Sequence, residues 1–430
     1  MLLVVKVGWE EAGHTERIRR VLDRALAGWT YTVIKREKAF LRWCVRTPAE
    51  KEGTAVLFAV ALPRAGVSLS YVHLVSCLVR HRHCLAGCRG AVLVDGQGEF
   101  FTKKIGRELI FFANQAGCIF PGKPLVEATG SLYNFNTQAK IQGLSNEEAY
   151  AVSAGHLVNK LLSFVRPSGS GKVKDIVVIH ASSRRTSNTL LLWEMVRCHL
   201  QGKAKVTEIS LRNGSVVDCR GCSYETCLHF GEKGDCFYGG VMVEKVYPAV
   251  RQGDVIVLVC PNYNDAVSAN ITAFFNRLTA LFRKEEAAFA NKEVYALVVS
   301  GYSGGDIVAE QILDAMNCNK NFILPPYFAL IETANDPKSI LRNAGIEDRA
   351  ARLAKYICMS GLARGEPAPG YVRFPVHFVG EITQIPNGSP TWRPLRATNH
   401  EKRDCRMKVY SIMRGPFLFV VCSTEFVVCR

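Results

Sequence analysis

Apolar strand-like runs alternate with helical patterns along most of this chain. That alternation limits the possible folds more than any other feature of the sequence. In the second half, five apolar runs are each followed by a pattern of helical period. The strand-like runs span residues 175–181, 205–211, 254–261, 293–304 and 327–332. The helical patterns span residues 188–200, 241–252, 268–282, 306–317 and 346–359. This order predicts an α/β fold with a five-stranded, doubly wound parallel sheet.

The first half also alternates strands and helices, so residues 1–165 are expected to form a second α/β domain. Residues 90–117 resemble residues 254–281 in layout, because both run from a strand through a polar loop to a helix with Phe-Phe and Asn. Two interpretations stay open: a degenerate copy of the second half, or an unrelated α/β domain. The strand at 55–62 is followed by PRAGVSLSY instead of a long polar loop, so we do not expect phosphate binding there.

Composition marks the boundaries between these regions. Residues 166–174 are rich in Pro, Gly, Ser and Lys and are expected to be a linker; Lys172 is followed by Val, which argues against a phosphate-binding Walker loop. A domain is therefore predicted at 175–360. The tail at 361–430 has no clear period, and an extra hairpin, a dimer contact or a poorly ordered segment all stay open.

Charge and hydropathy exclude several classes of protein. The net charge is +16, but the Lys and Arg residues form only short, separated groups, so nucleic-acid binding is not predicted. No apolar run is long enough to cross a bilayer. The N-terminus lacks a basic region and a small-residue cleavage site, and it is interpreted as a first strand. A cytoplasmic protein without a membrane partner is expected.

The polar loop from Ser182 to Thr189 joins a strand to a helix. Such a loop presents free backbone N–H groups at the positive end of a helix dipole, which suits a phosphate monoester. Its hydroxyls and Arg184 can add to that site. A plain helix cap by Ser187 or Asn188 is the alternative. No G-x-G-x-x-G is present, so this is not the dinucleotide fingerprint.

This loop resembles the S-x-R-x-x-S-N-T motif of the flavodoxin-like NAD(P)H-dependent FMN reductase family. The matching residues are Ser182, Arg184, Ser187, Asn188 and Thr189. In that family these residues hold the FMN phosphate. Ala181 and Ser183 replace the family's usual Gly and Pro. The resemblance implies a flavodoxin-like sheet for the second half.

Two further strand-end loops support the resemblance. The family's P-x-Y, Ser and F-x-D-R pattern is matched by Pro261, Tyr263, Ser268, Phe274 and Arg277, with Asn276 in place of the Asp. Loops of this kind at strand ends can bind a flat polar ring, although a turn followed by a helix cap would look the same. The predicted contacts are Pro261, Asn262, Tyr263, Asn264, Ser268, Gly301, Tyr302 and Gly304.

Four of the 16 cysteines are clustered as C-x2-C-x4-C-x8-C. They are Cys219, Cys222, Cys227 and Cys236. Four thiolates on a flexible loop can hold a [4Fe–4S] cluster or zinc, or stay free as redox-active thiols. Iron–sulfur flavoproteins of this fold have a more compact cysteine motif at a similar place.

The hypothesis for the chain is an FMN-dependent oxidoreductase that takes hydride from NAD(P)H and reduces an unidentified acceptor. The flavin carries the chemistry, so no catalytic side chain is predicted. The resemblance also implies a homodimer. An iron–sulfur flavoprotein that carries electrons, and a non-enzymatic flavodoxin-like scaffold, are the alternatives.

Overall fold

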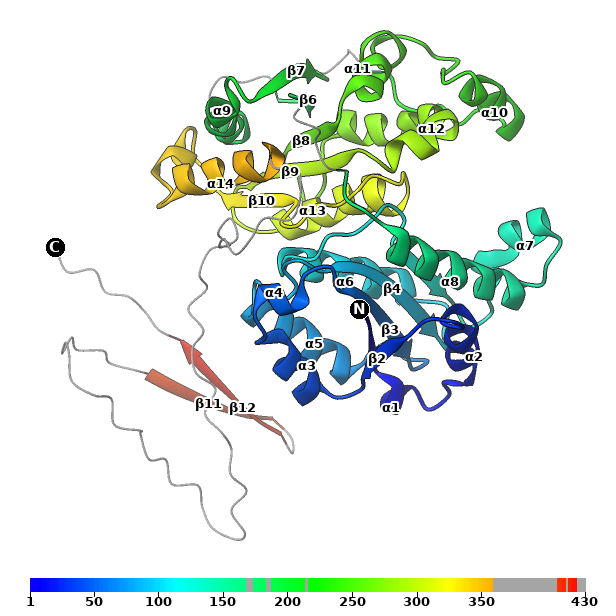
Figure 1. The fold of residues 1–430 in the computed structure, drawn as a ribbon. Coiled ribbons are helices and arrows are strands. Elements are labelled where there is room, and N and C mark those ends of the chain that lie inside the picture. Colours follow the sequence, from blue (N-terminus) through cyan, green and yellow to red (C-terminus); the bar gives the residue numbers. More distant parts are fainter. Residues whose placement is uncertain (168–172, 183–186, 213–215, 359–407, 415–416, 424–430) are drawn as a thin grey trace. The chain divides into compact units, whose positions relative to one another are not determined.

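The computed structural model describes residues 1–167, 173–182, 187–212, 216–358, 408–414 and 417–423. The chain falls into two compact units, 1–373 and 374–430, and each is described by itself. Both predicted α/β regions lie in the first unit (Figure 1). The predicted boundaries at 165, 175 and 360 stay predictions.

The second half forms a parallel five-stranded sheet, as predicted. Its strands are β6 (Lys174–His180), β7 (Ala204–Ser210), β8 (Val255–Pro261), β9 (Glu293–Ser300) and β10 (Ala329–Thr333). Their order across the sheet is β7-β6-β8-β9-β10. Numbered within this half, that is 2-1-3-4-5, the flavodoxin-like order.

The first half has the same strand order, β2-β1-β3-β4-β5, again all parallel. Its strands are β1 (Leu2–Val7), β2 (Tyr31–Ile34), β3 (Ala55–Leu62), β4 (Arg89–Gly96) and β5 (Leu125–Ala128). Of the two interpretations left open for this half, the flavodoxin-like copy is therefore the correct one.

The alignment of the two halves that the sequence suggested was nevertheless wrong by one strand and its following helix. It paired the strand at 90–96 with the one at 254–261, whereas β4 and β9 are both fourth strands and β8 is a third. The counterpart of the polar loop at 182–189 is consequently the segment after β1, not the loop after β3. The error arose because β2 is short and has only Ile34 buried, so it has no apolar run to recognise.

Helices cover both faces of each sheet, as a doubly wound fold requires. In the first half they are α1 (Trp9–Ala12), α2 (Glu16–Ala25), α3 (Glu37–Cys44), α4 (Pro48–Lys51), α5 (Leu69–Arg80), α6 (Thr102–Gln115), α7 (Asn136–Gln142) and α8 (Asn146–Ser163). In the second half they are α9 (Asn188–Leu200), α10 (Tyr224–Glu232), α11 (Tyr247–Gln252), α12 (Ala269–Phe289), α13 (Gly305–Leu313) and α14 (Ile346–Cys358). Short η segments lie at Tyr133–Phe135, Met242–Val246, Asp314–Cys318 and Ser339–Arg342.

Strands β3 and β9 are buried throughout because helices cover both sides of each sheet. All eight residues of β3 and of β9 are buried. Such strands appear in the sequence as largely apolar runs, so β3 was predicted with its observed ends and β9 with its observed start, although the predicted run continued to residue 304. Among the described residues, no helix is long and apolar enough to cross a membrane.

The two halves meet through matching segments, each between a fourth strand's helix and the fifth strand. Phe120 and Leu324 exchange backbone hydrogen bonds, with N–O distances of 3.0 and 2.9 Å. Asn114 donates from Nδ2 to the Pro325 carbonyl across the seam (2.7 Å). Asn317 makes the reciprocal bond to the Pro121 carbonyl (3.0 Å). These paired contacts relate the halves by an approximate two-fold.

Close backbone approach at this seam needs a glycine in one place. A Cβ on Gly122 would overlap the backbone of Asn321. The aromatic and aliphatic cores next to the seam join into a single buried cluster that includes Phe111, Phe120 and Phe322. The two halves therefore share a core as well as backbone hydrogen bonds.

The second unit contains an antiparallel hairpin, β11 (Lys408–Arg414) with β12 (Phe417–Ser423). Of the alternatives for the tail, an extra hairpin is thus found at its end. Residues 359–407 lie outside the described residues.

Candidate functional site

The candidate site lies at the carboxyl edge of the second sheet. The strands β6, β8 and β9 are adjacent and parallel, so their following loops meet at one edge. These are the three loops that the sequence singled out. In doubly wound sheets this edge is where ligands bind, at the point where the strand order reverses.

The first loop leaves one hydroxyl buried and unpaired. His180, at the end of β6, is fixed by Glu208 through Nε2 (3.2 Å) and by the Ser182 carbonyl through Nδ1 (3.2 Å). Ser182 is 6% exposed, and its Oγ has no hydrogen-bond partner among the described residues. A buried hydroxyl without a partner is costly, which favours a ligand that supplies one. Arg184 lies outside the described residues.

The other predicted residues of this loop have structural contacts. Ser187 is the N-cap of α9 and accepts a hydrogen bond from the Leu190 N–H (3.4 Å). The Asn188 amide donates to the carbonyls of Ala334 (3.0 Å) and Asp336 (2.8 Å), so it fastens the start of α9 to the segment after β10. Thr189 is buried. Their contacts with FMN stay predictions.

The second loop forms a tight reversal at the end of β8. Tyr263 and Ala266 exchange backbone hydrogen bonds of 3.0 and 3.1 Å. Asn264 and Asp265 lie between them with φ values of 52° and 58°. Positive φ at both central positions is the type I′ geometry, which Asn and Asp tolerate better than other side chains. This turn leaves the Tyr263 ring 56% exposed at the edge of the sheet.

Asn262 joins the second loop to the third. Its Nδ2 donates to the Ser303 carbonyl (2.7 Å) and to Ser300 Oγ (3.3 Å), while its Oδ1 accepts from the Asp265 N–H (2.8 Å). The side chain is therefore a support that fixes two strand ends relative to each other. Pro261 ends β8, and Ser268 caps α12 by accepting from the Ile271 N–H.

The third loop needs glycine for a geometric reason. Gly304 has φ 78°, and a Cβ there would overlap Asp265 Oδ1 and approach Asn262 Nδ2 to 2.9 Å. Gly301 lies against Asn335, whose Nδ2 donates to the Tyr302 hydroxyl (3.0 Å). The Tyr302 ring is 80% exposed. Tyr263 and Tyr302 are thus two exposed residues on neighbouring loops that Asn262 connects.

Asn276 and Arg277 serve the cysteine loop instead of the strand-end loops. The Arg277 guanidinium donates to the carbonyls of Val217 (3.1 Å) and Gly239 (2.6 Å). Asn276 Nδ2 donates to Asp218 Oδ1 (3.2 Å). This pair of residues on α12 therefore holds both ends of the segment that carries the four cysteines.

The four cysteines of that segment act on two tyrosines. Desolvation and then Cys222 raise the pKa of Tyr238, with a smaller effect of Cys219. Burial and then Cys236 raise the pKa of the buried Tyr247, with a smaller effect of Cys227. Within the described part of the chain, no three His, Cys, Asp or Glu side chains are placed to hold a metal. As arranged, the thiols do not fit an iron–sulfur cluster or zinc.

Several supporting residues could not be found from the sequence. Asn335 comes from the segment after β10, and Gln311 comes from α13. Gln311 accepts from the Val267 N–H (3.1 Å) and donates to the Asp265 carbonyl (2.9 Å). Each of these residues contacts a partner more than 30 positions away in the sequence, and no local motif predicts such contacts.

The residues present fit the phosphate and ring of FMN. Ser182 supplies an unpaired hydroxyl just after the end of β6, and Tyr263 and Tyr302, both exposed, lie in loops at the same edge of the sheet. By fold, the second half is a flavodoxin-like domain. Its residues 175–336 match the sequence model of the NADPH-dependent FMN reductase family, which confirms the resemblance seen in the loops.

One curated protein and several solved structures are similar to part of this chain at low identity. An iron–sulfur flavoprotein of Archaeoglobus fulgidus is 29% identical over 143 residues, which is 32% of this chain and 69% of the relative. The Trp repressor binding protein from Bacillus subtilis is 18% identical, with 41% of this chain and 99% of that chain covered and a TM-score of 0.30. The NAD(P)H:quinone oxidoreductase from Methanothermobacter marburgensis is 13% identical, with coverages of 43% and 98% and a TM-score of 0.34.

Proposed function

We propose that this protein is an FMN-dependent oxidoreductase that uses NAD(P)H to reduce an acceptor not yet identified. The observation that carries the proposal is the buried, unpaired Ser182 hydroxyl just after β6, inside the segment that matches the FMN reductase family. A phosphate oxygen would satisfy that hydroxyl and the free N–H groups of the first helical turn together.

The chain's own residues have binding and orienting roles. The start of α9 and Ser182 hold the phosphate, and the rings of Tyr263 and Tyr302 border the flavin. Asn262 keeps the second and third loops at a fixed spacing through its bonds to Asp265 and Ser303. When bound, FMN would supply the hydride and electron transfer that no side chain of this protein can perform.

Reconstitution with FMN tests the proposal directly. The purified chain is titrated with FMN, and flavin fluorescence and anaerobic NADPH oxidation are followed. We expect saturable binding of one FMN per chain and bleaching of the bound flavin by NADPH or NADH. A chain that folds but binds no FMN would overturn the proposal.

Ser182→Ala sharpens this test. Loss of the hydroxyl is expected to weaken FMN binding about tenfold, since a hydrogen bond to a charged group contributes about 1.5 kcal/mol. The matched control is Ser68→Ala in the first half, where Ser68 Oγ caps α5 by accepting from the Tyr71 N–H (3.2 Å). It should lower stability by about 1 kcal/mol and leave FMN binding unchanged.

The homodimer stays a prediction. The seam through Phe120 and Leu324 is already filled within one chain, so a second copy would have to use another face. Light scattering on the full chain distinguishes a monomer of 47.6 kDa from a particle of twice that mass.

A further inference from the structure

A groove of about 650 Å³ runs between α12 and α13, beside the seam. One wall is a single face of α12, from Thr272 to Phe282, and the other is the face of α13 that carries Glu310 and Asp314. Its size lies within the range of small-molecule sites. In the first half the corresponding helices, α5 and α6, pack directly on each other. The groove is therefore particular to the second half.

Positive charge is in excess at one end of this groove. Asp314 forms an ion pair with Arg107 of the first half (2.6 Å). The same carboxylate is also influenced by Lys320, which lines the groove, and by Lys103, which lies outside the groove lining and pairs with Glu127 (4.0 Å). Two of these cations come from α6, and Lys320 comes from the segment before β10. The charge excess therefore depends on both halves of the chain.

Lys320 is the unusual member of this group. The residue is only 8% exposed and lines the groove. No group among the described residues makes a hydrogen bond or a close ion pair with its ammonium, and Asp314 acts on it only at longer range. Burial lowers the pKa of Lys320 to about 8, so it is still mostly charged at neutral pH. A buried cation without a close partner is costly unless a ligand provides the countercharge.

The remaining acid of the groove does not cancel this charge. Burial raises the pKa of Glu310 to about 7, with a further contribution from Glu108 and Asp306. Glu310 is therefore close to half protonated at neutral pH. Apolar side chains, Phe275 and Ile307 among them, line the rest of the groove. The surface as a whole suits a molecule with an apolar body and one acidic group.

We propose that the groove between α12 and α13 binds a small organic anion, with its carboxylate or phosphate group at Lys320 and Arg107 and its apolar part along Phe275. The site gives the first half a role in ligand binding, because Arg107 belongs to it. The proposal does not rest on FMN binding, since none of these residues lies in the three strand-end loops.

Two fluorescent probes with related ring systems test the site. 8-Anilinonaphthalene-1-sulfonate carries one negative charge, and N-phenyl-1-naphthylamine carries none. Both are titrated into the full chain, with and without FMN. We expect the anionic probe to bind, and Lys320→Met to weaken it about tenfold while the neutral probe is unaffected, as loss of a charged hydrogen-bond donor predicts. Methionine keeps the length of the side chain, so the fold should persist.

The control variant is Lys245→Met, at an exposed lysine on another helix segment. It should change neither titration. Equal affinity of the anionic probe for the wild type and for Lys320→Met would overturn the proposal, and so would a loss of both probes together. FMN binding by Lys320→Met is measured alongside, so a failure here is distinguishable from a failure of the FMN proposal.

Competition then identifies the acidic group. Hexyl phosphate and hexanoate are each added to the complex with the anionic probe. Displacement by one of them in the wild type, but not in Lys320→Met, supports the site and names a phosphate or a carboxylate. Displacement by neither would mean that the probe reports apolar surface only, and the proposal would fail.

Discussion

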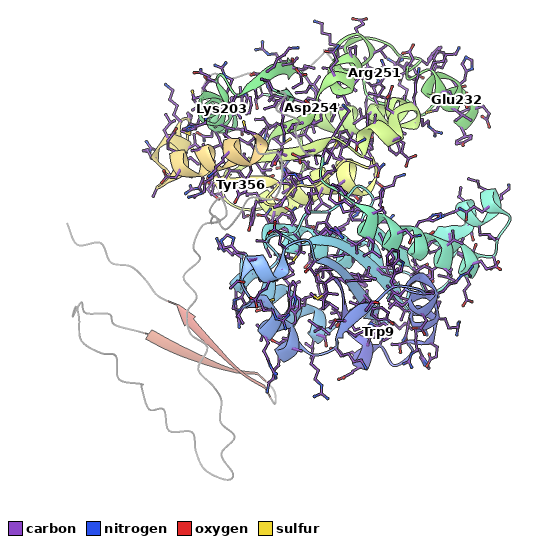
Figure 2. All side chains as sticks on the ribbon, viewed as in Figure 1. Trp9, Lys203, Glu232, Arg251, Asp254 and Tyr356 are labelled. Atoms are coloured by element: carbon purple, nitrogen blue, oxygen red, sulfur yellow. The ribbon has the colours of Figure 1, made fainter. Side chains whose placement is uncertain are left out.

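The two sheets have the same strand order, yet their carboxyl edges differ. In the first half, the Arg17 guanidinium on α2 lies across the ends of β4 and β5. It pairs with both Asp95 oxygens (2.9 Å each) and donates to the carbonyls of Gly96, Thr129 and Gly130. Trp9, labelled in Figure 2, fills space beside β3 and donates to the Ala59 carbonyl (2.8 Å). The chain's own side chains thus occupy this edge.

In the second half, the start of α9 is connected to the segment after the fifth strand by the hydrogen bonds of an amide side chain. Asn188 fastens the helix to the carbonyls after β10, as Arg17 fastens α2 to those after β5. A short amide replaces a guanidinium and its partner carboxylate. The hydroxyl of Ser182 and the rings of Tyr263 and Tyr302 stay available. The comparison shows that the two edges differ in the side chain that connects the helix to the carbonyls after the fifth strand.

The largest effect is expected from Arg17→Met. The substitution leaves Asp95, whose side chain is 7% exposed, without its cation. Breaking a largely buried ion pair in this way should lower the free energy of unfolding by about 3 kcal/mol. Urea denaturation of the full chain measures it.

A matched control lies on the same helix. Arg20 pairs with Glu147 on the surface, with both side chains more than half exposed, so Arg20→Met should cost less than about 1 kcal/mol. Similar decreases in the free energy of unfolding for the two variants would show that Arg17 does not stabilise the carboxyl edge of the first sheet. A second FMN bound by Arg17→Met would show that this arginine alone closes a working site.

The second prediction compares one glycine at the carboxyl edge of each sheet. Gly8 and Gly304 both have positive φ, and a Cβ at Gly8 would overlap the Ala61 carbonyl. Gly8→Ala and Gly304→Ala should each cost about 2 kcal/mol in the free energy of unfolding, from backbone strain and overlap. Only Gly304→Ala should also weaken FMN binding, by about tenfold or more, since it displaces Asp265 and Asn262.

Gly202→Ala separates the two causes. Gly202 has φ 70° but nothing lies within 4 Å of its Cβ position, so that variant reports the strain alone. Equal effects of Gly8→Ala and Gly304→Ala on FMN binding would contradict the assignment of the flavin to the second half.

A smaller effect is expected on the pH dependence of stability, from Glu310 near the seam between the halves. Glu310 has a raised pKa of about 7 because of burial, then Glu108 and Asp306. Because the pKa of this acid is higher in the folded state than in the unfolded state, its protonated form favours the folded state. That contribution to the free energy of unfolding is present below about pH 4.5 and is lost as pH rises to about 7. Because Glu310 is partly exposed, we expect a loss of only about 1 kcal/mol. Glu310→Gln should be more stable than the wild type at pH 8 and about equal to it at pH 4.5.

The comparison is measured by urea denaturation at both pH values. A wild type and variant that differ equally at pH 4.5 and pH 8 would exclude Glu310 as the titrating group. Glu16→Gln, at an exposed acid on α2, serves as the control and should show no such difference.

The smallest effect is expected from the four clustered cysteines. The corresponding segment of the first half, residues 35–54, carries one cysteine, Cys44. Since the four thiols do not form a metal-binding group, Cys219→Ser with Cys222→Ser should change NADPH oxidation less than about twofold. Iron and zinc analysis of anaerobically purified protein accompanies the assay. A stoichiometric metal that these substitutions remove would restore the iron–sulfur or zinc alternative.

Sequence patterns were sufficient for the parts of the fold with local signals. Strand β3 was predicted with its observed ends because helices bury it on both sides, and Ser187 was recognisable as a cap. Strand β2 was missed because three of its four residues are exposed, and α10 was missed because its sequence reads as a cysteine-rich loop. The missing β2 then shifted the alignment of the two halves.

For the candidate site, the sequence indicated the right three loops but not the role of each side chain. Asn188 was predicted as a phosphate ligand, and its amide instead contacts Ala334, 146 positions away. The pairing of Arg17 with Asp95 spans 78 positions. Hydrogen bonds of this kind depend on the order of the strands in space, which must be known before any single residue can be assigned.

The reciprocal bonds between Phe120 and Leu324 have a consequence for how such a chain diverges. They join main-chain atoms, so they impose no requirement on the side chains of Phe120 and Leu324 themselves. The seam around them does require Gly122, Asn114 and Asn317. After a duplication, either copy could accumulate substitutions at its strand ends without losing its partner. A fusion of this kind leaves the strand ends of either copy free to change, and selection can then act on them for a different purpose.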